Sequence, residues 1–89
     1  MEVVISGNEP VTDGMRQAAE SIFSRLSEKF EFNSPSVHFE VNGRGTSVSL
    51  CCKSQHVDLI IKSTKLDFYQ AIRASSKSMK LKLCEIKNK

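Results

Sequence analysis

The sequence lacks any long hydrophobic run. No segment of its 89 residues approaches the roughly 20 apolar residues that span a bilayer. Residues 1–7 contain no basic residue ahead of their short apolar run, so they do not match a secretory signal peptide. These absences predict a cytoplasmic protein, and the length predicts one domain over residues 1–89.

Cysteines are few and show no pairing pattern. Cys51, Cys52 and Cys84 are odd in number and lack the spacing of a disulfide framework. Cys51 and Cys52 are adjacent, so on a strand they point to opposite faces. We therefore expect reduced thiols that behave as small hydrophobic side chains.

Side chains that build catalytic or metal sites are equally sparse. No CxxC, HxxxH or paired-carboxylate spacing occurs, so no closed set of metal ligands is predicted. His38 and His56 are expected on the surface. His38 could lie beside Cys51, but a nucleophile pair needs an orienting third group that the sequence does not supply. Gly43-Arg44-Gly45 joins two expected strands, which excludes a phosphate loop that opens a helix. We expect no enzyme activity and no cofactor.

Acidic residues are scarce in the second half of the chain. Residues 1–44 hold four basic and seven acidic residues, a net charge of −3. Residues 45–89 hold nine basic and three acidic residues, a net charge of +6. The imbalance indicates an anionic partner for the second half, although charge alone is equally compatible with an ordinary solvated helix face.

The apolar pattern divides the chain into six elements, of which the first two are a strand and a helix. Residues 2–6 alternate like a short strand, with Val3 and Ile5 on one face. Thr12 is a good N-cap for a helix over residues 13–30, where apolar positions recur at helical spacing. We expect Asn33-Ser34-Pro35 to end this helix.

Three strands and a second helix follow. Apolar residues alternate with mostly polar ones over residues 37–41, 48–52 and 57–62. Asn42-Gly43 predicts a type I′ turn between the first two of these strands, and another turn is expected near Ser54-Gln55. Asp67 is the expected N-cap of the last helix, which continues nearly to the C-terminus.

The element order β-α-β-β-β-α predicts an α+β fold. The first helix is a crossover, so the strands on either side of it should be parallel, and two hairpins add antiparallel strands. Each strand has one apolar face, which predicts a four-stranded mixed sheet covered on one side only. Both helices should cover that face of a two-layer sandwich, because neither can bury its apolar stripe alone.

The last helix carries a line of basic residues. Arg73, Lys77 and Lys80 follow at i, i+4 and i+7, and Lys87 continues the line two turns later. Lys82 lies elsewhere on the helix, whose only acidic neighbours are Asp67 and Glu85. Like charges at this spacing repel, and an anionic ligand would relieve that repulsion. Phosphate is the natural match.

Three further residues are weaker candidates for RNA contact. Tyr69 lies one turn before Arg73 and could stack on a base, although packing of its ring is the favoured interpretation. Arg25 and Lys29 are one turn apart on the first helix, where they could join the basic surface or pair with nearby glutamates.

Three stretches of the sequence resemble one protein family. They are Ile5-Ser6-Gly7-Asn8 with residues 11–16, the end of the first helix from Phe23 to Phe30, and the helix opening at residues 67–72 (Asp-Phe-Tyr-Gln-Ala-Ile). In this order they resemble the ribosome hibernation promoting factor family, also called the sigma-modulation or ribosome-associated inhibitor family. The element order also resembles double-stranded-RNA-binding domains, but their lysine cluster at the start of the last helix is missing.

The family resemblance implies a function. Members bind the decoding channel of the small ribosomal subunit, overlap the mRNA and tRNA sites and hold ribosomes inactive under stress. The chain resembles the short form, so any pairing of ribosomes would need a separate dimerising factor. The residues expected to contact rRNA are Arg73, Lys77, Lys80, Lys87, Lys82, Arg25, Lys29 and Tyr69.

Two other functions stay open on the sequence alone. One is a general double-stranded-RNA-binding domain, for which a plain RNA duplex would serve as well as the small subunit. The other is a protein-interaction module that uses the open sheet face around His38, Cys51 and Ile60. Both share the predicted fold with the ribosome-binding hypothesis.

Overall fold

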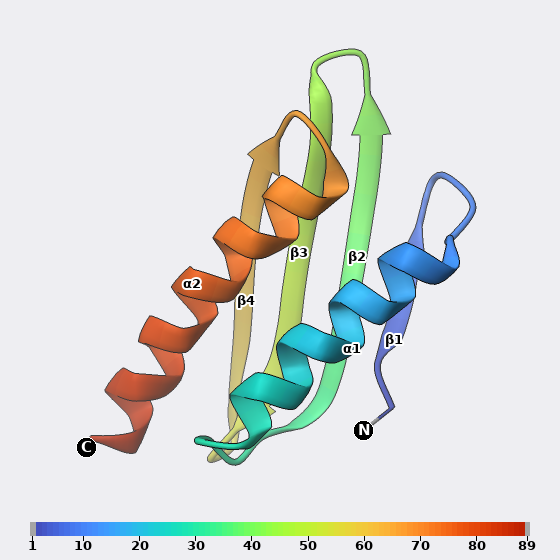
Figure 1. Ribbon diagram of the computed structural model, residues 1–89. Coiled ribbons are helices and arrows are strands. Elements are labelled where there is room, and N and C mark those ends of the chain that lie inside the picture. The colour runs from blue at the N-terminus through green and yellow to red at the C-terminus, as the bar shows by residue number, and fades with distance from the viewer. Residues whose placement is uncertain (1, 89) are drawn as a thin grey trace.

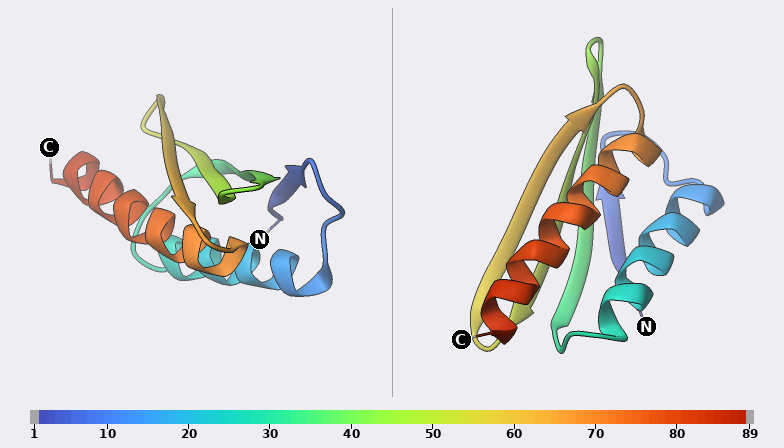
Figure 2. Two further views of the ribbon diagram at one scale, coloured as in Figure 1. Left: turned by 90° about the horizontal axis from the view of Figure 1, so that it is seen from above. Right: turned by 60° about the vertical axis from the view of Figure 1, so that its left-hand side comes forward.

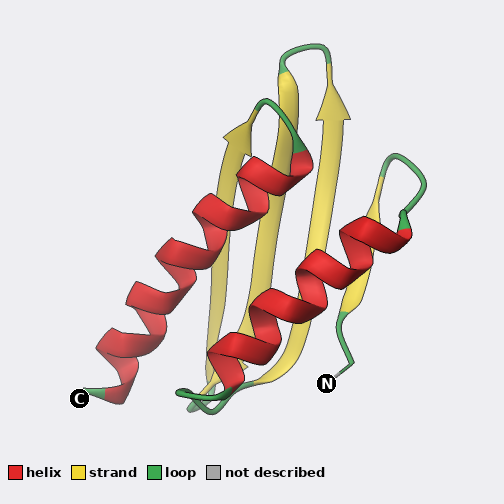
Figure 3. Cartoon of the chain, viewed as in Figure 1, coloured by secondary structure: helices red, strands yellow, loops and turns green. Residues whose placement is uncertain are grey.

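The computed structural model describes residues 2–88 and contains six elements in the predicted order. The bounds of the strands and helices are β1 Val4–Gly7, α1 Asp13–Ser27, β2 Asn33–Asn42, β3 Gly45–Ser54, β4 Val57–Lys65 and α2 Phe68–Lys87. Figure 1 traces this path and Figure 3 shows the short loops between elements.

The strands form one four-stranded sheet in the order β1-β2-β3-β4. β1 pairs with β2 in parallel, and β2–β3 and β3–β4 pair antiparallel. Both helices lie on the same face of the sheet, α1 in front of β1 and β2, and α2 in front of β3 and β4 (Figures 1 and 2). The predicted α+β two-layer sandwich with a mixed sheet is therefore confirmed.

The core lies between the helices and the inner sheet face. Alternate strand residues point inward, so Val37, Phe39, Val48 and Leu50 are 0–1% exposed. Phe23 of α1 is fully buried against this layer. The core is completed by Val3, Ile5, Met15, Ala19, Leu26, Cys52, Leu59, Phe68, Ala71, Ile72, Met79 and Leu83. The helices therefore cover one sheet face, as the alternation predicted.

Helix α1 begins where expected and ends early. The Oγ1 atom of Thr12 accepts a hydrogen bond from the Met15 backbone N–H at 3.1 Å, which makes it the N-cap. The last helical residue is Ser27, three residues before the predicted end at Phe30. Phe30 keeps its apolar contact with the core from a turn in which its backbone N–H bonds to Leu26. The helical spacing of apolar residues therefore extends beyond the last residue of α1, which is why the predicted helix is too long.

Asn33-Ser34-Pro35 was predicted to end the first helix, and instead it belongs to β2. The β2–β3 register shifts between Asn33 and Ser36, and Ser34 has a left-handed φ of 56°. This irregularity is a β-bulge-like break that lets a proline occupy the beginning of a strand.

The predicted type I′ turn at Asn42-Gly43 is wrong, although the hairpin is where it was expected. Asn42 pairs with Gly45, so the two loop residues are Gly43 and Arg44, and neither has positive φ. The Asn42 Oδ1 atom accepts a hydrogen bond from the Arg44 backbone N–H at 2.8 Å, and this Asx turn directs the chain. The β3–β4 hairpin has the left-handed pair instead, with φ of 51° at Gln55 and 67° at His56.

Helix α2 is capped by Asp67, whose Oδ1 atom accepts a hydrogen bond from the Gln70 backbone N–H at 2.8 Å. Its buried side chains face β3 and β4. Ser75 is fully buried and donates its hydroxyl to the carbonyl of Ala71 at 2.9 Å. Neither this helix nor α1 is long and apolar enough to cross a membrane, within residues 2–88.

Candidate nucleic-acid interface

The side of α2 that points away from the sheet carries Arg73, Lys77 and Lys80, which we call the basic stripe. At about 100° per residue these three positions lie within roughly 60° of one another around the helix. All three side chains are exposed, whereas Ile72, Met79 and other buried residues hold the opposite side of the helix against the sheet. The packing of α2 therefore fixes which way the basic stripe faces.

Within residues 2–88, no carboxylate lies within 4.0 Å of a cation of the basic stripe. Among residues 2–88, ion pairs within 4.0 Å join only Lys82 to Glu85 and His38 to Glu40. Two like charges at i, i+4 on a helix destabilise it by about 0.2 to 0.5 kcal/mol. This small repulsion is relieved when a polyanion binds, so the arrangement favours phosphate ligands.

Lys87 continues the line of charge along α2 but is engaged within the fold. Its Nζ atom donates to the backbone carbonyl of Lys29 at 3.2 Å and lies 5.7 Å from the centre of the Phe30 ring. The end of α2 is thereby joined to the segment that follows α1. A lysine ammonium has three donors, so two remain for another partner.

The other predicted basic residues are exposed but differ in their surroundings. Lys82 lies 4.0 Å from Glu85, one turn along α2. Arg25 lies in the last turn of α1, and Lys29 lies in the connection to β2. The structure therefore gathers Arg73, Lys77 and Lys80 in one line, brings Lys87 close to Lys29, and leaves Lys82 with a carboxylate partner.

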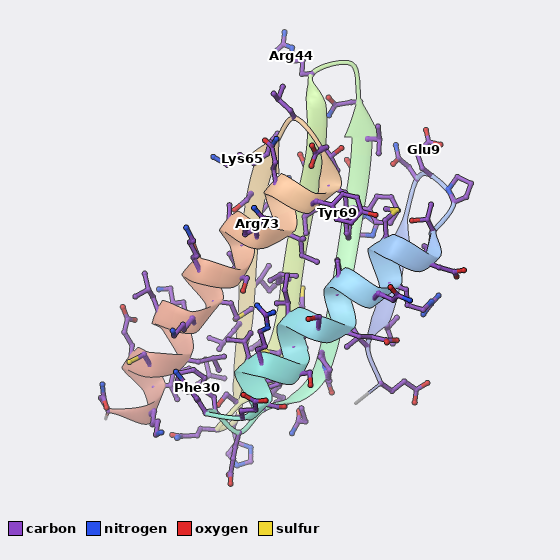
Figure 4. All side chains as sticks on the ribbon, in the orientation of Figure 1. Glu9, Phe30, Arg44, Lys65, Tyr69 and Arg73 are labelled. Atoms are coloured by element: carbon purple, nitrogen blue, oxygen red, sulfur yellow. The ribbon has the colours of Figure 1, made fainter. Side chains whose placement is uncertain are left out.

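Tyr69 packs between the two helices. Figure 4 shows its side chain extending from the first turn of α2 towards the beginning of α1. A Cβ atom on Gly14 would lie only 2.6 Å from the Tyr69 hydroxyl, so glycine is what allows this approach. The ring also meets Phe68 edge to face, with ring centres 5.6 Å apart. This agrees with the packing interpretation, although Tyr69 is still 46% exposed.

Comparison with solved structures finds the same fold in other proteins, among them the following two. A ribosomal subunit interface protein from Coxiella burnetii has a TM-score of 0.87 at 15% identity, and 100% of both chains is covered. The N-terminal domain of Thermus thermophilus Protein Y has a TM-score of 0.83 at 16% identity, with 94% of each chain covered. The chain has the fold of the ribosomal subunit interface proteins.

This result confirms, for the architecture, the resemblance to the hibernation promoting factor family that the sequence indicated. No protein-family model and no curated protein matches the sequence. At 15–16% identity, the similarity to these two proteins is a similarity of backbone fold. The likeness therefore identifies the fold, and the chain's own side chains determine which ligand its surface suits.

The structure adds basic residues that were not among the predicted RNA contacts. Arg44 is at the tip of the β2–β3 hairpin, and Lys65 ends β4 beside the beginning of α2 (Figure 4). Lys53, near the other end of β3, lines a cleft together with Lys29 and Lys87. Lys29, Lys53 and Lys87 come from the α1–β2 connection, β3 and the end of α2, so no local pattern could have grouped them.

The outer face of the sheet is the remaining candidate surface. His38 is exposed there, with its Nδ1 atom 3.2 Å from the Ser6 hydroxyl and its Nε2 atom 3.7 Å from Glu40. Cys51 and Ile60 are paired across β3 and β4, and Ile60 is 68% exposed. In residues 2–88 no three His, Cys, Asp or Glu side chains gather as metal ligands. This face offers hydroxyl and aliphatic contacts with little net charge.

Proposed function

We propose that this protein binds rRNA of the small ribosomal subunit through the basic stripe and holds the subunit inactive by occupying the channel for mRNA and tRNA. The observation that carries the proposal is the line of three exposed cations that have no carboxylate partner among the described residues, on the fold of the ribosomal subunit interface proteins. In this role the protein is a cytoplasmic, stress-related translation inhibitor.

The basic stripe suits a phosphate backbone for a physical reason. Each cation that neutralises a phosphate releases a condensed counterion, and this release supplies much of the binding free energy at low salt. Arg73 to Lys80 spans about 10 Å along the helix axis. The stripe is rigidly presented, because the opposite side of α2 is buried over the same length. The backbone therefore needs little ordering on binding, and the entropy lost is mainly that of the three side chains.

Inhibition by occupancy requires no bond to be made or broken. The protein extends over 40 × 23 × 18 Å, so bound in the channel it would exclude mRNA and tRNA by volume. We therefore propose a non-catalytic role without a cofactor. The partner is rRNA of the small subunit, and Arg25 and Lys29 could add contacts from the neighbouring helix.

Co-sedimentation with isolated small subunits tests the proposal. We expect the wild-type chain to pellet with the subunits at low salt, and Lys77→Glu with Lys80→Glu to abolish pelleting, because two phosphate contacts become repulsive. Arg16→Glu with Lys62→Glu is the matched control. It makes the same change in net charge at exposed positions on α1 and β4, outside the basic stripe, and should still pellet.

Four results would contradict the proposal. The wild-type chain could fail to pellet with small subunits, or both double variants could behave alike. A plain RNA duplex that competed as strongly as the small subunit would favour a general double-stranded-RNA binder. Binding to a protein that is insensitive to salt would favour the outer sheet face, where Val4 and Ile60 are 65% and 68% exposed.

A further inference from the structure

A cleft opens where the end of α2 meets two connections of the sheet. Its volume is about 680 Å³, within the range of small-molecule sites. The walls come from the α1–β2 connection, the β3–β4 turn and the last turns of α2. The residues that line it are Lys29, Phe30, Glu31, Phe32, Asn33, Lys53, Ser54, Gln55, Leu83, Ile86 and Lys87.

The walls of the cleft are fixed by bonds within the fold. Ser54, at the end of β3, donates its hydroxyl to the Glu31 carbonyl at 2.8 Å. Lys87 donates to the Lys29 carbonyl from the opposite wall. Phe32 packs on the buried Phe23 with ring centres 5.7 Å apart. The cleft is therefore formed before any ligand arrives, so little ordering entropy opposes binding.

The lining combines an apolar floor with an excess of positive charge. Phe30, Phe32 and Ile86 are half-buried, and Leu83 is buried beneath them. Three lysines and one carboxylate, Glu31, line the cleft, so its charged residues sum to +2. A ligand that matches both features has a flat apolar part and an anionic part joined to it. A nucleotide has this composition, with a base that stacks on aromatic rings and a phosphate that pairs with lysine.

The cleft also continues the basic stripe. Lys87 lies seven residues after Lys80, so it is on the same side of α2 and about 10 Å further along the axis. A phosphate backbone that follows Arg73, Lys77 and Lys80 towards the C-terminus reaches this wall of the cleft. Figure 4 shows Phe30 beside the last turns of α2, at the opposite end of the molecule from Arg44.

We propose that the cleft takes one unpaired nucleotide of the bound RNA. Its base lies against Phe30 and Ile86, and its phosphate is held by Lys29, Lys53 and the two remaining donors of Lys87. This inference rests on the proposed RNA binding and deepens it. It specifies that an unpaired nucleotide of the RNA lies in the cleft, apart from the phosphates that the basic stripe contacts. It predicts a preference for a bulged or unstacked nucleotide over a continuous duplex.

Fluorescence anisotropy with three labelled RNAs tests the cleft. The RNAs are a duplex of about 16 base pairs, the same duplex with one bulged nucleotide, and the duplex with an abasic bulge that keeps the phosphate. We expect the wild-type chain to bind the bulged RNA about tenfold more tightly than the duplex, since a stacked base contributes roughly that factor. The abasic bulge should lose the gain.

Two variants assign the preference to the cleft. Phe30→Leu keeps the net charge and removes the ring, so it should bind the duplex like the wild-type chain and lose the tenfold preference. Lys53→Glu should lose the preference for the bulged RNA as well. Because this variant also changes the net charge, its effect is measured as the ratio of its affinities for the bulged RNA and the duplex. Lys62→Glu is the matched control on the neighbouring strand, outside the cleft, and should keep the ratio. Thermal unfolding checks that each variant is folded.

Failure of this inference is distinct from failure of the proposed function. Equal binding of the bulged RNA and the duplex by the wild-type chain overturns the cleft assignment while small-subunit binding can still hold. A preference that persists in both Phe30→Leu and Lys53→Glu, or that the abasic bulge retains, overturns it too. An acidic peptide that displaced the bulged RNA from the wild-type chain but not from Phe30→Leu would assign the cleft to a protein ligand.

Discussion

At the scale of single residues, Cys52 is a buried thiol that must stay protonated. It lies between β3 and α2, with its Sγ atom 3.8 Å from the Sδ atom of Met79. Burial, and secondarily the neighbouring Cys51, raises the pKa of Cys52 from 9.0 to about 11. The thiolate is therefore disfavoured in the fold but readily forms in the unfolded chain.

This pKa shift predicts how stability falls at alkaline pH. Because the folded pKa is the higher one, the contribution of the neutral thiol is fully present below pH 9 and is lost as the pH rises towards 11. Cys52→Val has no such titration. The free energy of unfolding of the wild-type chain should therefore fall, relative to Cys52→Val, by about 2 kcal/mol between pH 8 and 11.

Urea unfolding at several pH values measures the difference. Cys84→Ser removes an exposed thiol outside the core and controls for the loss of a thiol as such. Parallel profiles for the wild-type chain and Cys52→Val would contradict the assignment of the raised pKa to Cys52.

Lys87 shows what single-residue reasoning from sequence could and could not reach. Its place on the basic side of α2 followed from helical spacing. Its hydrogen bond to Lys29 joins residues 58 positions apart and depends on how the two helices converge. Similarly, Tyr69 was expected to pack, but its partner Gly14 lies in the other helix. Periodicity places a side chain on a side of its helix, and only tertiary structure supplies the neighbour.

At the scale of elements, the two β-hairpins have turn conformations that differ from those their residues favour. The Asn42-Gly43 pair favours a type I′ turn, yet the left-handed pair occurs at Gln55 and His56. Left-handed φ is unfavourable by about 1–2 kcal/mol for most L residues. The sheet register imposes a two-residue loop between Ser54 and Val57, and this overrides the local preference.

Replacing Gln55-His56 by Asn-Gly should therefore stabilise the protein. Gln55→Asn with His56→Gly relieves the left-handed strain at both positions, and the extra freedom of glycine in the unfolded chain offsets part of the gain. We expect a net increase of about 1 kcal/mol in the free energy of unfolding. Urea denaturation should show a higher midpoint with an unchanged slope.

The other hairpin gives the matched control for this substitution. Arg44 is also in a two-residue loop, but its φ is not positive. Arg44→Gly should therefore lower the stability by about 0.5 kcal/mol, because glycine adds only unfolded-state freedom there. Equal effects of glycine in the two hairpins would show that backbone strain does not distinguish them.

At the scale of the whole molecule, the sequence predicted the layers better than the surfaces they form. Alternating apolar residues predicted the one-sided covering of the sheet, because burial dominates the free energy of folding. The element order predicted which strands pair in parallel and which pair antiparallel. The basic stripe followed from a single helix. The cleft did not, since Lys29, Lys53 and Lys87 come from three segments that only the packed fold brings together. Surfaces built from one element can thus be read from sequence, whereas those built from several require the structure.

The salt dependence of RNA binding tests the basic stripe for the molecule as a whole. Each phosphate neutralised on duplex RNA should contribute about 0.9 to the slope of log K against log salt concentration. Lys77→Gln with Lys80→Gln should therefore reduce the magnitude of the slope by about 2. Arg16→Gln with Lys62→Gln removes the same charge elsewhere and should leave the slope close to that of the wild-type chain.

This difference in slope has a measurable consequence for affinity. Between 50 and 200 mM salt the concentration rises fourfold, so a slope difference of 2 corresponds to roughly a 16-fold change in relative affinity. The defect of Lys77→Gln with Lys80→Gln should thus be large at low salt and shrink by about that factor at high salt. A defect that stayed constant across the range would mean that these lysines act by shaping α2, and the phosphate contacts would have to be sought on another face.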